Sequence, residues 1–236
     1  SFDNSKNYII SGYLGDFAMT YFKKSSIRYD FDFVILYDNV FYDDLYITHE
    51  QLYELTRAIL LFCAKNKLKL IIKTKYKKTF KDYKALNKLS KKFKDIIIFE
   101  YGRADLTPAF KAKIAIGLSN SSLVNIASCW GVPSILYDKF DMIDNQILSK
   151  NCFIVNDIEN FNFRLNLIYN SKKLYKLDSN SPLDPFVDGK ALKRIYFYIN
   201  MIEKINGSKK EKIYKANAKY KKLYGNDKIY LKSSRE

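Results

Sequence analysis

Apolar runs alternate with helix-periodic segments along the middle of this chain, and this alternation constrains its fold more than any other feature. The runs are rich in β-branched and aromatic residues and lack a two-residue polar period, which is typical of strands buried on both faces. We predict six strands: Asp32–Asp38, Lys67–Lys75, Asp95–Gly102, Lys113–Ser119, Pro133–Asp138 and Cys152–Asp157.

Between these strands, apolar residues recur at helical spacing. The clearest helix begins at Thr48, because Gln51 three residues later completes the capping-box pattern. Gly131 ends another, since glycine is common just past a helix terminus. The segments are Thr48–Asn66, Lys81–Phe93, the short turn Ala104–Ala112, Ser121–Gly131 and Asn160–Asn170. The predicted fold class is therefore α/β: a doubly wound, Rossmann-like parallel sheet followed by carboxyl-terminal helices.

Three regions are expected along the 236 residues. Residues 29–170 form the Rossmann-like domain, and residues 171–236 carry helices, one of them from about Gly189, and a basic tail. Residues 1–28 fit the alternation poorly, and we interpret them as a linker or the remnant of an amino-terminal domain. Because the chain starts with Ser1 rather than Met, we expect a fragment of a longer protein.

Several classes of protein are disfavoured by the composition. No apolar stretch approaches the roughly 20 residues that a membrane-spanning helix needs, and no signal-peptide pattern opens the chain. Cys63, Cys129 and Cys152 share no metal-ligand spacing, and there is one histidine, so a zinc site is not expected. We interpret the cysteines as reduced core thiols of a cytoplasmic protein, soluble or peripheral at the inner face of the membrane.

The net charge of +16 is concentrated near the carboxyl terminus. Residues 187–236 hold 14 basic and 5 acidic residues. Such a surface suits nucleic acid, anionic lipid or phosphorylated substrates. An apolar stripe lies among the lysines and consists of Ile213, Ala216, Tyr220, Leu223 and Tyr224. We expect this basic helix either to contact an anionic membrane surface or to dock lightly on the domain.

Four small polar residues, Ser119-Asn120-Ser121-Ser122, stand where the fourth strand leads into its helix. Ligands of open parallel sheets bind at the carboxyl ends of the strands. A helix start offers free backbone N–H groups and partial positive charge, so phosphate is the natural ligand there. The alternative is an ordinary helix cap, because serine and asparagine are common at that position.

The stretch "SNSSLVNIASCWGVPSILYD" resembles the carboxyl-terminal half of GT-B fold glycosyltransferases. The nearest likeness is to bacterial enzymes of capsule and lipopolysaccharide synthesis, the loose group around polysialyl-, Kdo- and glycerophosphotransferases. It covers Phe31–Asn170. In that group a paired Ser-Ser/Thr motif at the helix start contacts the phosphate of a nucleotide sugar. The resemblance implies donor contacts by Ser119, Asn120, Ser121 and Ser122.

The resemblance also assigns roles at the ends of the second and third strands. Many relatives have Lys-x-His-Pro after the second strand, whereas this chain has "IIKTKYKK", which argues against a close tie to the polysialyl group. Lys73 and Lys75 are expected to supply positive charge there. After the third strand, Tyr101 is placed to stack on a base and Arg103 to pair with phosphate, the alternative being a surface salt bridge.

After the fifth strand, the resemblance places Asp144 and Gln146 against the sugar, the alternative being solvated loop residues. His49 lies at a helix start on the same side of the sheet, where it either helps to bind substrate or is structural. The adjacent carboxylates Asp43 and Asp44 are interpreted as a polar loop rather than an acid–base pair.

Taken together, the resemblance implies a glycosyltransferase that transfers a sugar from a nucleotide-sugar donor to a surface polysaccharide or lipopolysaccharide acceptor. This chain would carry the donor-binding half, with a glycan or lipid-linked acceptor bound largely by a missing amino-terminal domain. No catalytic base is identified, and neither a metal nor another cofactor is expected. The alternatives are a sugar-nucleotide epimerase or hydrolase of the same fold, or a basic nucleic-acid-binding protein. The last has no zinc spacing, RNP motif or helix-turn-helix pattern to support it, so no nucleic-acid partner is expected.

Overall fold

The computed structural model describes residues 7–12, 33–38, 48–74, 83–102, 108–118, 121–141, 143, 148–171, 178 and 185–231. The chain forms two compact units. The sheet unit comprises residues 22–187, and the terminal unit joins residues 1–21 to residues 188–236. Each unit has its own core and is described separately.

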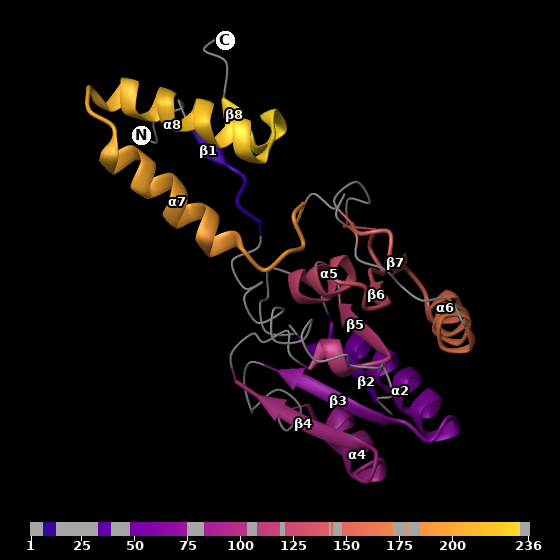
Figure 1. The fold of residues 1–236 in the computed structure, drawn as a ribbon. Helices are drawn as coiled ribbons and strands as arrows, with labels where there is room; N and C mark the ends of the chain where they lie inside the picture. Colours follow the sequence, from indigo (N-terminus) through magenta and orange to yellow (C-terminus); the bar gives the residue numbers. More distant parts are fainter. Residues whose placement is uncertain are drawn as a thin grey trace. The chain divides into compact units, whose positions relative to one another are not determined.

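Among the described residues of the sheet unit, strands and helices largely alternate in sequence, with β7 following β6 directly (Figure 1). The strands are β2 (Phe33–Asp38), β3 (Lys69–Thr74), β4 (Ile97–Tyr101), β5 (Ile114–Leu118), β6 (Ser134–Tyr137) and β7 (Cys152–Val155). The helices are α2 (His49–Lys65), α4 (Lys84–Lys92), α5 (Ser122–Cys129) and α6 (Ile158–Asn170), with a 3-10 turn, η3, at Ala109–Lys111. All strand pairs are parallel, in the order β4-β3-β2-β5-β6-β7. The doubly wound parallel sheet predicted from the sequence is thus confirmed.

Residues that the sequence identified as helix ends stand at helix ends in the structure. Thr48 caps α2, with its hydroxyl accepting from the backbone N–H of Gln51 at 3.2 Å while the Gln51 side chain accepts from Thr48 N at 3.0 Å. Gly131, past the end of α5, has a φ of 89°, a conformation that glycine adopts without strain. Helix α4 begins at Lys84, with Tyr83 in the cap position.

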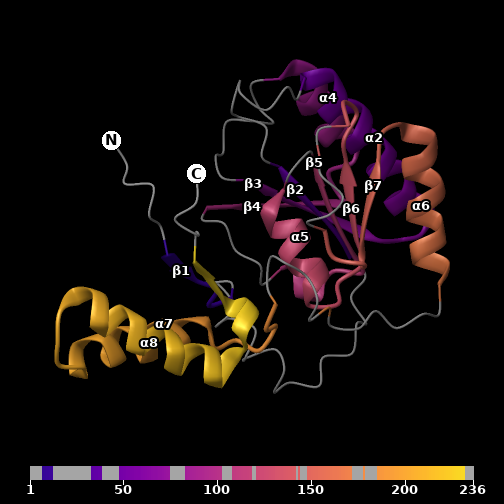
Figure 2. The same ribbon diagram turned by 90° about the horizontal axis from the view of Figure 1, so that it is seen from above.

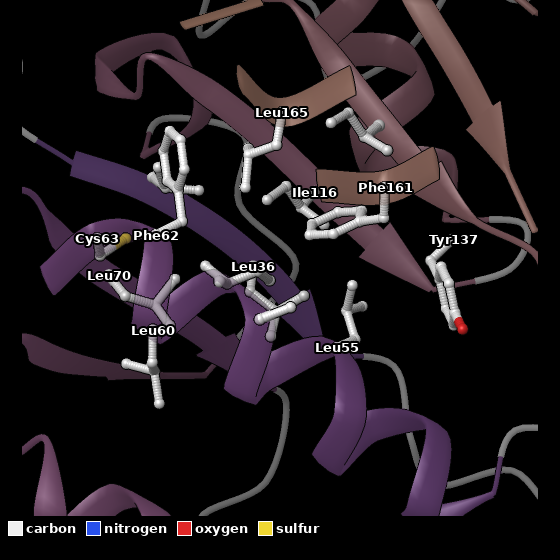
Figure 3. Close-up of a cluster of buried hydrophobic side chains, with 14 of the residues drawn as sticks. Leu36, Leu55, Leu60, Phe62, Cys63, Leu70, Ile116, Tyr137, Phe161 and Leu165 are labelled. Atoms are coloured by element: carbon white, nitrogen blue, oxygen red, sulfur yellow. The ribbon is translucent and has the colours of Figure 1, made fainter. Parts of the chain in front are cut away.

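Helices α2, α4 and α6 cover one face of the sheet, and α5 covers the other (Figure 2). The main core lies under the first three helices, and Figure 3 shows part of it. Its fully buried members include Leu36, Leu55, Leu60, Cys63, Leu70, Ile116, Phe161 and Leu165. This packing places the strand ends and the start of α5 on a rigid support.

The strand order reverses direction between β2 and β5. From β2 the chain moves to β3 and β4 on one side, and β5, β6 and β7 follow on the other. Crossovers of one hand then place the connecting helices on opposite faces, which opens a crevice at the carboxyl ends of β2 and β5. This switch point is the standard ligand-binding position of such sheets.

The terminal unit pairs the two ends of the described chain. Strand β1 (Asn7–Ile9) pairs antiparallel with β8 (Ile229–Leu231) beside helices α7 (Ala191–Lys204) and α8 (Lys209–Tyr224), with a 3-10 turn, η5, at Asn226–Lys228 (Figure 1). The sequence did not predict this two-stranded sheet. Helix α8 ends at Tyr224 because Gly225 follows with a φ of 109°. Strand β8 after it then pairs with a strand more than 200 residues away.

The three cysteines are buried and unbridged, as the sequence indicated. Within the described ranges, no helix is both long and apolar enough to cross a membrane.

Candidate functional site

The register of the sheet lines up residues near its carboxyl edge. Lys73 pairs with Glu100 on one side and Tyr37 on the other, and Tyr37 pairs in turn with Gly117. Neighbouring strands lie about 4.8 Å apart, so Lys73 and Gly117 are separated by roughly 10 Å. Lys73 and the start of α5 therefore lie on opposite sides of the switch point between β2 and β5.

Gly117 allows α5 to start directly against the sheet. A Cβ atom at Gly117 would lie 2.7 Å from the Cβ of Ser121 and 2.8 Å from Cγ2 of Val124. Both distances are too short for real carbon contacts, so only glycine fits without a shift. The sequence showed a strand leading into a polar segment. It did not show that the absence of a side chain at Gly117 allows α5 to pack this close to the strand.

Ser121 and Ser122 occupy different environments at the helix start. Ser121 is the cap residue and is fully buried, yet its side chain makes no capping hydrogen bond. Ser122 is the first helical residue and is exposed. Ser121 therefore does not cap α5 through its side chain. The exposed hydroxyl at the helix start is that of Ser122.

The side chain of Lys73 is only 10% exposed, and its Nζ lies 3.7 Å from Oε2 of Glu100. A nearly buried ammonium group is stabilised by an anionic partner. Glu100 on the edge strand supplies that partner while remaining 38% exposed. Part of the positive charge that Lys73 was expected to offer to a ligand is therefore neutralised by Glu100 within the sheet.

Tyr101 ends β4 beside the same edge and is 37% exposed. Its ring stacks on that of Phe99 with centroids 5.9 Å apart and planes 5° apart. Lys73, Tyr101, Ser121 and Ser122 are the predicted donor-binding residues that the structure describes. The others lie outside the described residues: Lys75, Arg103, Ser119, Asn120, Asp144 and Gln146. The same is true of Asp43 and Asp44.

A buried polar cluster, which sequence reasoning missed, holds the chain before β7 against α5. The Asn125 carboxamide oxygen accepts from Ser149 N at 3.3 Å, and Asn151 Nδ2 donates to the Ser128 carbonyl at 2.9 Å. Asn151 N also donates to Ser149 Oγ at 3.2 Å. All four residues are at most 5% exposed. An asparagine within the apolar run "LVNIASC" was the available signal.

The connection after β6 is held at its other end by Asp138. This buried carboxylate accepts from Ile143 N at 2.7 Å. Asp138 and Asn125 thus bind Ile143 and Ser149, which flank the positions of Asp144 and Gln146 in the sequence. Because Asn125 lies one turn after Ser121, helix α5 carries both the cap residue and this contact with Ser149.

His49 is exposed at the start of α2 and stacks on Tyr83, the residue before α4, with ring centroids 4.7 Å apart and planes 26° apart. Both helices start at the carboxyl edge of the sheet. The pair gives His49 a structural role, and a role in substrate binding stays a prediction. Among the described residues, no group of His, Cys, Asp or Glu side chains is arranged to hold a metal ion.

The apolar stripe of the basic tail packs inside the terminal unit. Ala216 and Tyr220 are fully buried in a cluster with Met201 and Ile229, and Tyr220 donates to the Ile10 carbonyl at 3.0 Å. Leu223, by contrast, is 55% exposed. The helix therefore docks within its own unit, and its contact with an anionic membrane surface stays a prediction.

Comparison with known proteins gives similarity at the level of structure only. No protein-family model and no curated protein matches the chain. The co-structure of S. aureus MnaA with UDP superposes with a TM-score of 0.52 at 15% identity, covering 81% of this chain and 52% of that one. A putative UDP-N-acetylglucosamine 2-epimerase from Listeria monocytogenes gives 0.56 at 13% identity, covering 84% and 54%.

The fold is GT-B-like. The chain spans about half the length of each of these structures. At this identity the likeness concerns the fold alone, which agrees with the expectation of a GT-B half. The finer expectation, a glycosyltransferase of the capsule or lipopolysaccharide type, stays a prediction.

Proposed function

We propose that the sheet unit binds a nucleotide sugar at its carboxyl edge, with the donor phosphates at the start of α5. The observation that carries this proposal is the close approach at Gly117, which seats the α5 start beside the switch point between β2 and β5. Backbone N–H groups at a helix start and the exposed Ser122 hydroxyl are suitable donors to phosphate oxygens.

The remaining predicted contacts extend from this point. In the proposal, Ser119, Asn120 and Ser121 complete the phosphate turn, while Lys73, Lys75 and Arg103 add positive charge. Tyr101 stacks on the base, and Asp144 with Gln146 contacts the sugar. A similar fold was solved in a co-structure with UDP, which supports a uridine nucleotide as the first ligand to test.

For the reaction, we propose glycosyl transfer from the bound nucleotide sugar to a polysaccharide or lipopolysaccharide acceptor, on the basis of the resemblance carried by Ser119–Ser122 and Gly131-Val132-Pro133. Epimerisation or hydrolysis of the sugar nucleotide is the second candidate. It is favoured by the structural similarity to a putative UDP-N-acetylglucosamine 2-epimerase. Acceptor binding and the catalytic base are assigned to neither unit.

Binding is tested by calorimetry with UDP, UDP-N-acetylglucosamine, CMP and a single-stranded oligonucleotide. We expect a nucleotide to bind and to raise the melting temperature further as its concentration increases. Binding of the oligonucleotide alone would instead favour the nucleic-acid alternative, and absence of any nucleotide binding would refute the proposal. NMR of the sugar-nucleotide mixture then separates the reactions, because epimerisation changes the sugar without an acceptor, whereas transfer requires one.

A further inference from the structure

The outer surface of α4, α2 and α6, here called the helical layer, combines exposed cations with exposed apolar side chains. A groove of about 330 Å³ runs between α2 and α6, and one of about 440 Å³ between α2 and α4. Arg57 and Leu61 line both grooves, so they form the ridge between them. Helix α2 lies in the middle of the layer (Figure 2).

Positive charge dominates this surface. The grooves are lined by four cations, Arg57, Lys65, Lys88 and Lys92, and by one anion, Glu54. Helix α4 holds four lysines in nine residues and no acidic residue. The ion pairs formed among described residues involve none of the four groove cations. Lys92 Nζ lies 5.7 Å from the centroid of the Phe93 ring, and the charges of the four cations are not neutralised by an ion pair among the described residues.

The exposed apolar side chains stand on the ridges of the layer rather than in its grooves. Leu61 is 49% exposed on α2, and Phe163 is 64% exposed on α6. The apolar groove residues Phe62 and Leu89 are at most 7% exposed. The apolar area offered to a partner thus projects outwards, between cations.

We propose that the helical layer is a contact face for an anionic phospholipid surface. Lysine and arginine side chains near an anionic leaflet are attracted by its surface potential, and protruding apolar side chains enter the headgroup region. A soft lipid surface accepts convex apolar ridges such as Leu61 and Phe163, which are 49% and 64% exposed on α2 and α6. This inference does not depend on the proposed nucleotide site.

The chain has a second basic surface, helix α8, which makes the proposal specific. Its apolar stripe is largely occupied, because Ala216 and Tyr220 pack inside the terminal unit. The exposed face of α8 carries lysines together with Tyr214 and Leu223, which are 75% and 55% exposed. Helix α8 is therefore the competing lipid-binding surface, and variants of the two surfaces distinguish it from the helical layer.

The test is co-sedimentation of the full chain with vesicles of phosphatidylglycerol and phosphatidylcholine, and with phosphatidylcholine alone. Binding is expected only with the anionic vesicles, and it should weaken as salt is added. In the layer variant, Arg57→Glu, Lys88→Glu and Lys92→Glu reverse three charges. The matched control reverses three exposed lysines of α8 by Lys215→Glu, Lys219→Glu and Lys222→Glu. A basic residue near the leaflet contributes roughly fivefold, so the layer variant, which loses three of them, should bind at least about a hundredfold more weakly.

Loss of binding in the layer variant with retention in the α8 variant supports the proposal. Equal loss in both variants shows only a net-charge effect and overturns it, as does loss confined to the α8 variant or no binding by the wild type. Should the charge-reversed protein not fold, Arg57→Gln, Lys88→Gln and Lys92→Gln give the same comparison with less repulsion. An oligonucleotide bound by the layer in place of vesicles also overturns the lipid assignment.

The apolar side chains provide an independent readout. Leu61→Ser with Phe163→Ser should lower vesicle binding several-fold, and the effect should persist at high salt because it does not depend on charge. The control replaces two exposed residues of α8, Tyr214→Ser and Leu223→Ser. If the layer substitutions leave binding unchanged, the layer is not inserted among lipid headgroups.

Discussion

Gly117 and Ser121 are in such close contact that a single added carbon on Gly117 would lie 2.7 Å from the Cβ of Ser121. The end of strand β5 and the start of helix α5 are therefore packed without space for a side chain at Gly117. In the proposed function the donor phosphates bind at this helix start, so this contact positions the backbone N–H groups that face the ligand.

Gly117→Ala is predicted to move the start of α5 away from the sheet. Overpacking of this kind costs about 1–3 kcal/mol of stability, and nucleotide affinity should fall with it. Chemical denaturation and calorimetry measure the two effects. Adding Ser121→Gly and Val124→Ala removes the two contacts, and this triple variant should regain part of the lost stability. An unchanged protein after Gly117→Ala alone would show that the turn has room to relax.

Ser122→Ala is predicted to weaken nucleotide binding while leaving folding nearly unchanged. Its hydroxyl is exposed at the helix start, and a hydrogen bond to a charged group contributes roughly 1.5–3 kcal/mol, or about tenfold or more in affinity. Calorimetry with UDP measures the loss, and Ser90→Ala on α4 serves as the control. Unaltered affinity for UDP would show that the Ser122 hydroxyl does not contact the donor phosphates.

The strand order could be predicted from the sequence, whereas the contacts between distant side chains could not. The apolar runs, the Thr48–Gln51 capping box and Gly131 are local signals, and each led to an element that the structure contains. The doubly wound topology followed from general rules of strand connection. The polar turn before α5 followed from the same reasoning, because it stands where a strand meets its helix.

Contacts between distant residues were not predictable in this way. Arg194 and Ser11 are 183 positions apart, and Asn125 and Ser149 are 24 apart. Each pair depends on the completed fold rather than on a local pattern. The apolar stripe of α8 shows the same limit: its spacing indicated a helix with one apolar face, but only the packing against β1 and α7 shows what covers that face.

Asn125→Ala is predicted to destabilise the sheet unit. The substitution leaves the buried Ser149 N–H without its acceptor, at a cost of about 1–3 kcal/mol. The connection held by this bond was predicted to contact the sugar, so affinity for UDP-N-acetylglucosamine should fall more than affinity for UDP. Asn125→Asp keeps an acceptor oxygen and serves as the conservative control. Equal losses for both ligands would mean that the bond serves stability alone.

Arg194→Met is predicted to loosen the terminal unit. The guanidinium is nearly buried, forms a bidentate pair with Asp188 at 2.7 and 2.9 Å, and donates through Nε to the Ser11 carbonyl at 2.8 Å. Removing it leaves the Ser11 carbonyl without this donor and the Asp188 carboxylate without its guanidinium partner, which costs roughly 2–4 kcal/mol. Hydrogen exchange of the amides in β1 and β8 should accelerate, while Lys193→Met, at an exposed neighbouring position, should not change it.

Alkaline conditions are predicted to destabilise the sheet unit through its buried thiols. Burial raises the pKa of Cys63 from its ordinary value of 9.0 to about 12, and burial is also the main cause that raises the pKa of Cys152 to about 12. The unfolded chain then loses these protons first, so stability is fully present below pH 9 and falls as the pH rises towards 12. Each such thiol contributes a slope of about 1.4 kcal/mol per pH unit in that window.

Urea unfolding of the wild type and of Cys63→Ala between pH 8 and 11 isolates one thiol, because other groups titrate equally in both proteins. The free energy of unfolding of the variant should fall less steeply, by about 1.4 kcal/mol per pH unit. Equal slopes of unfolding free energy against pH in the two proteins would rule out Cys63 as a source of the alkaline sensitivity.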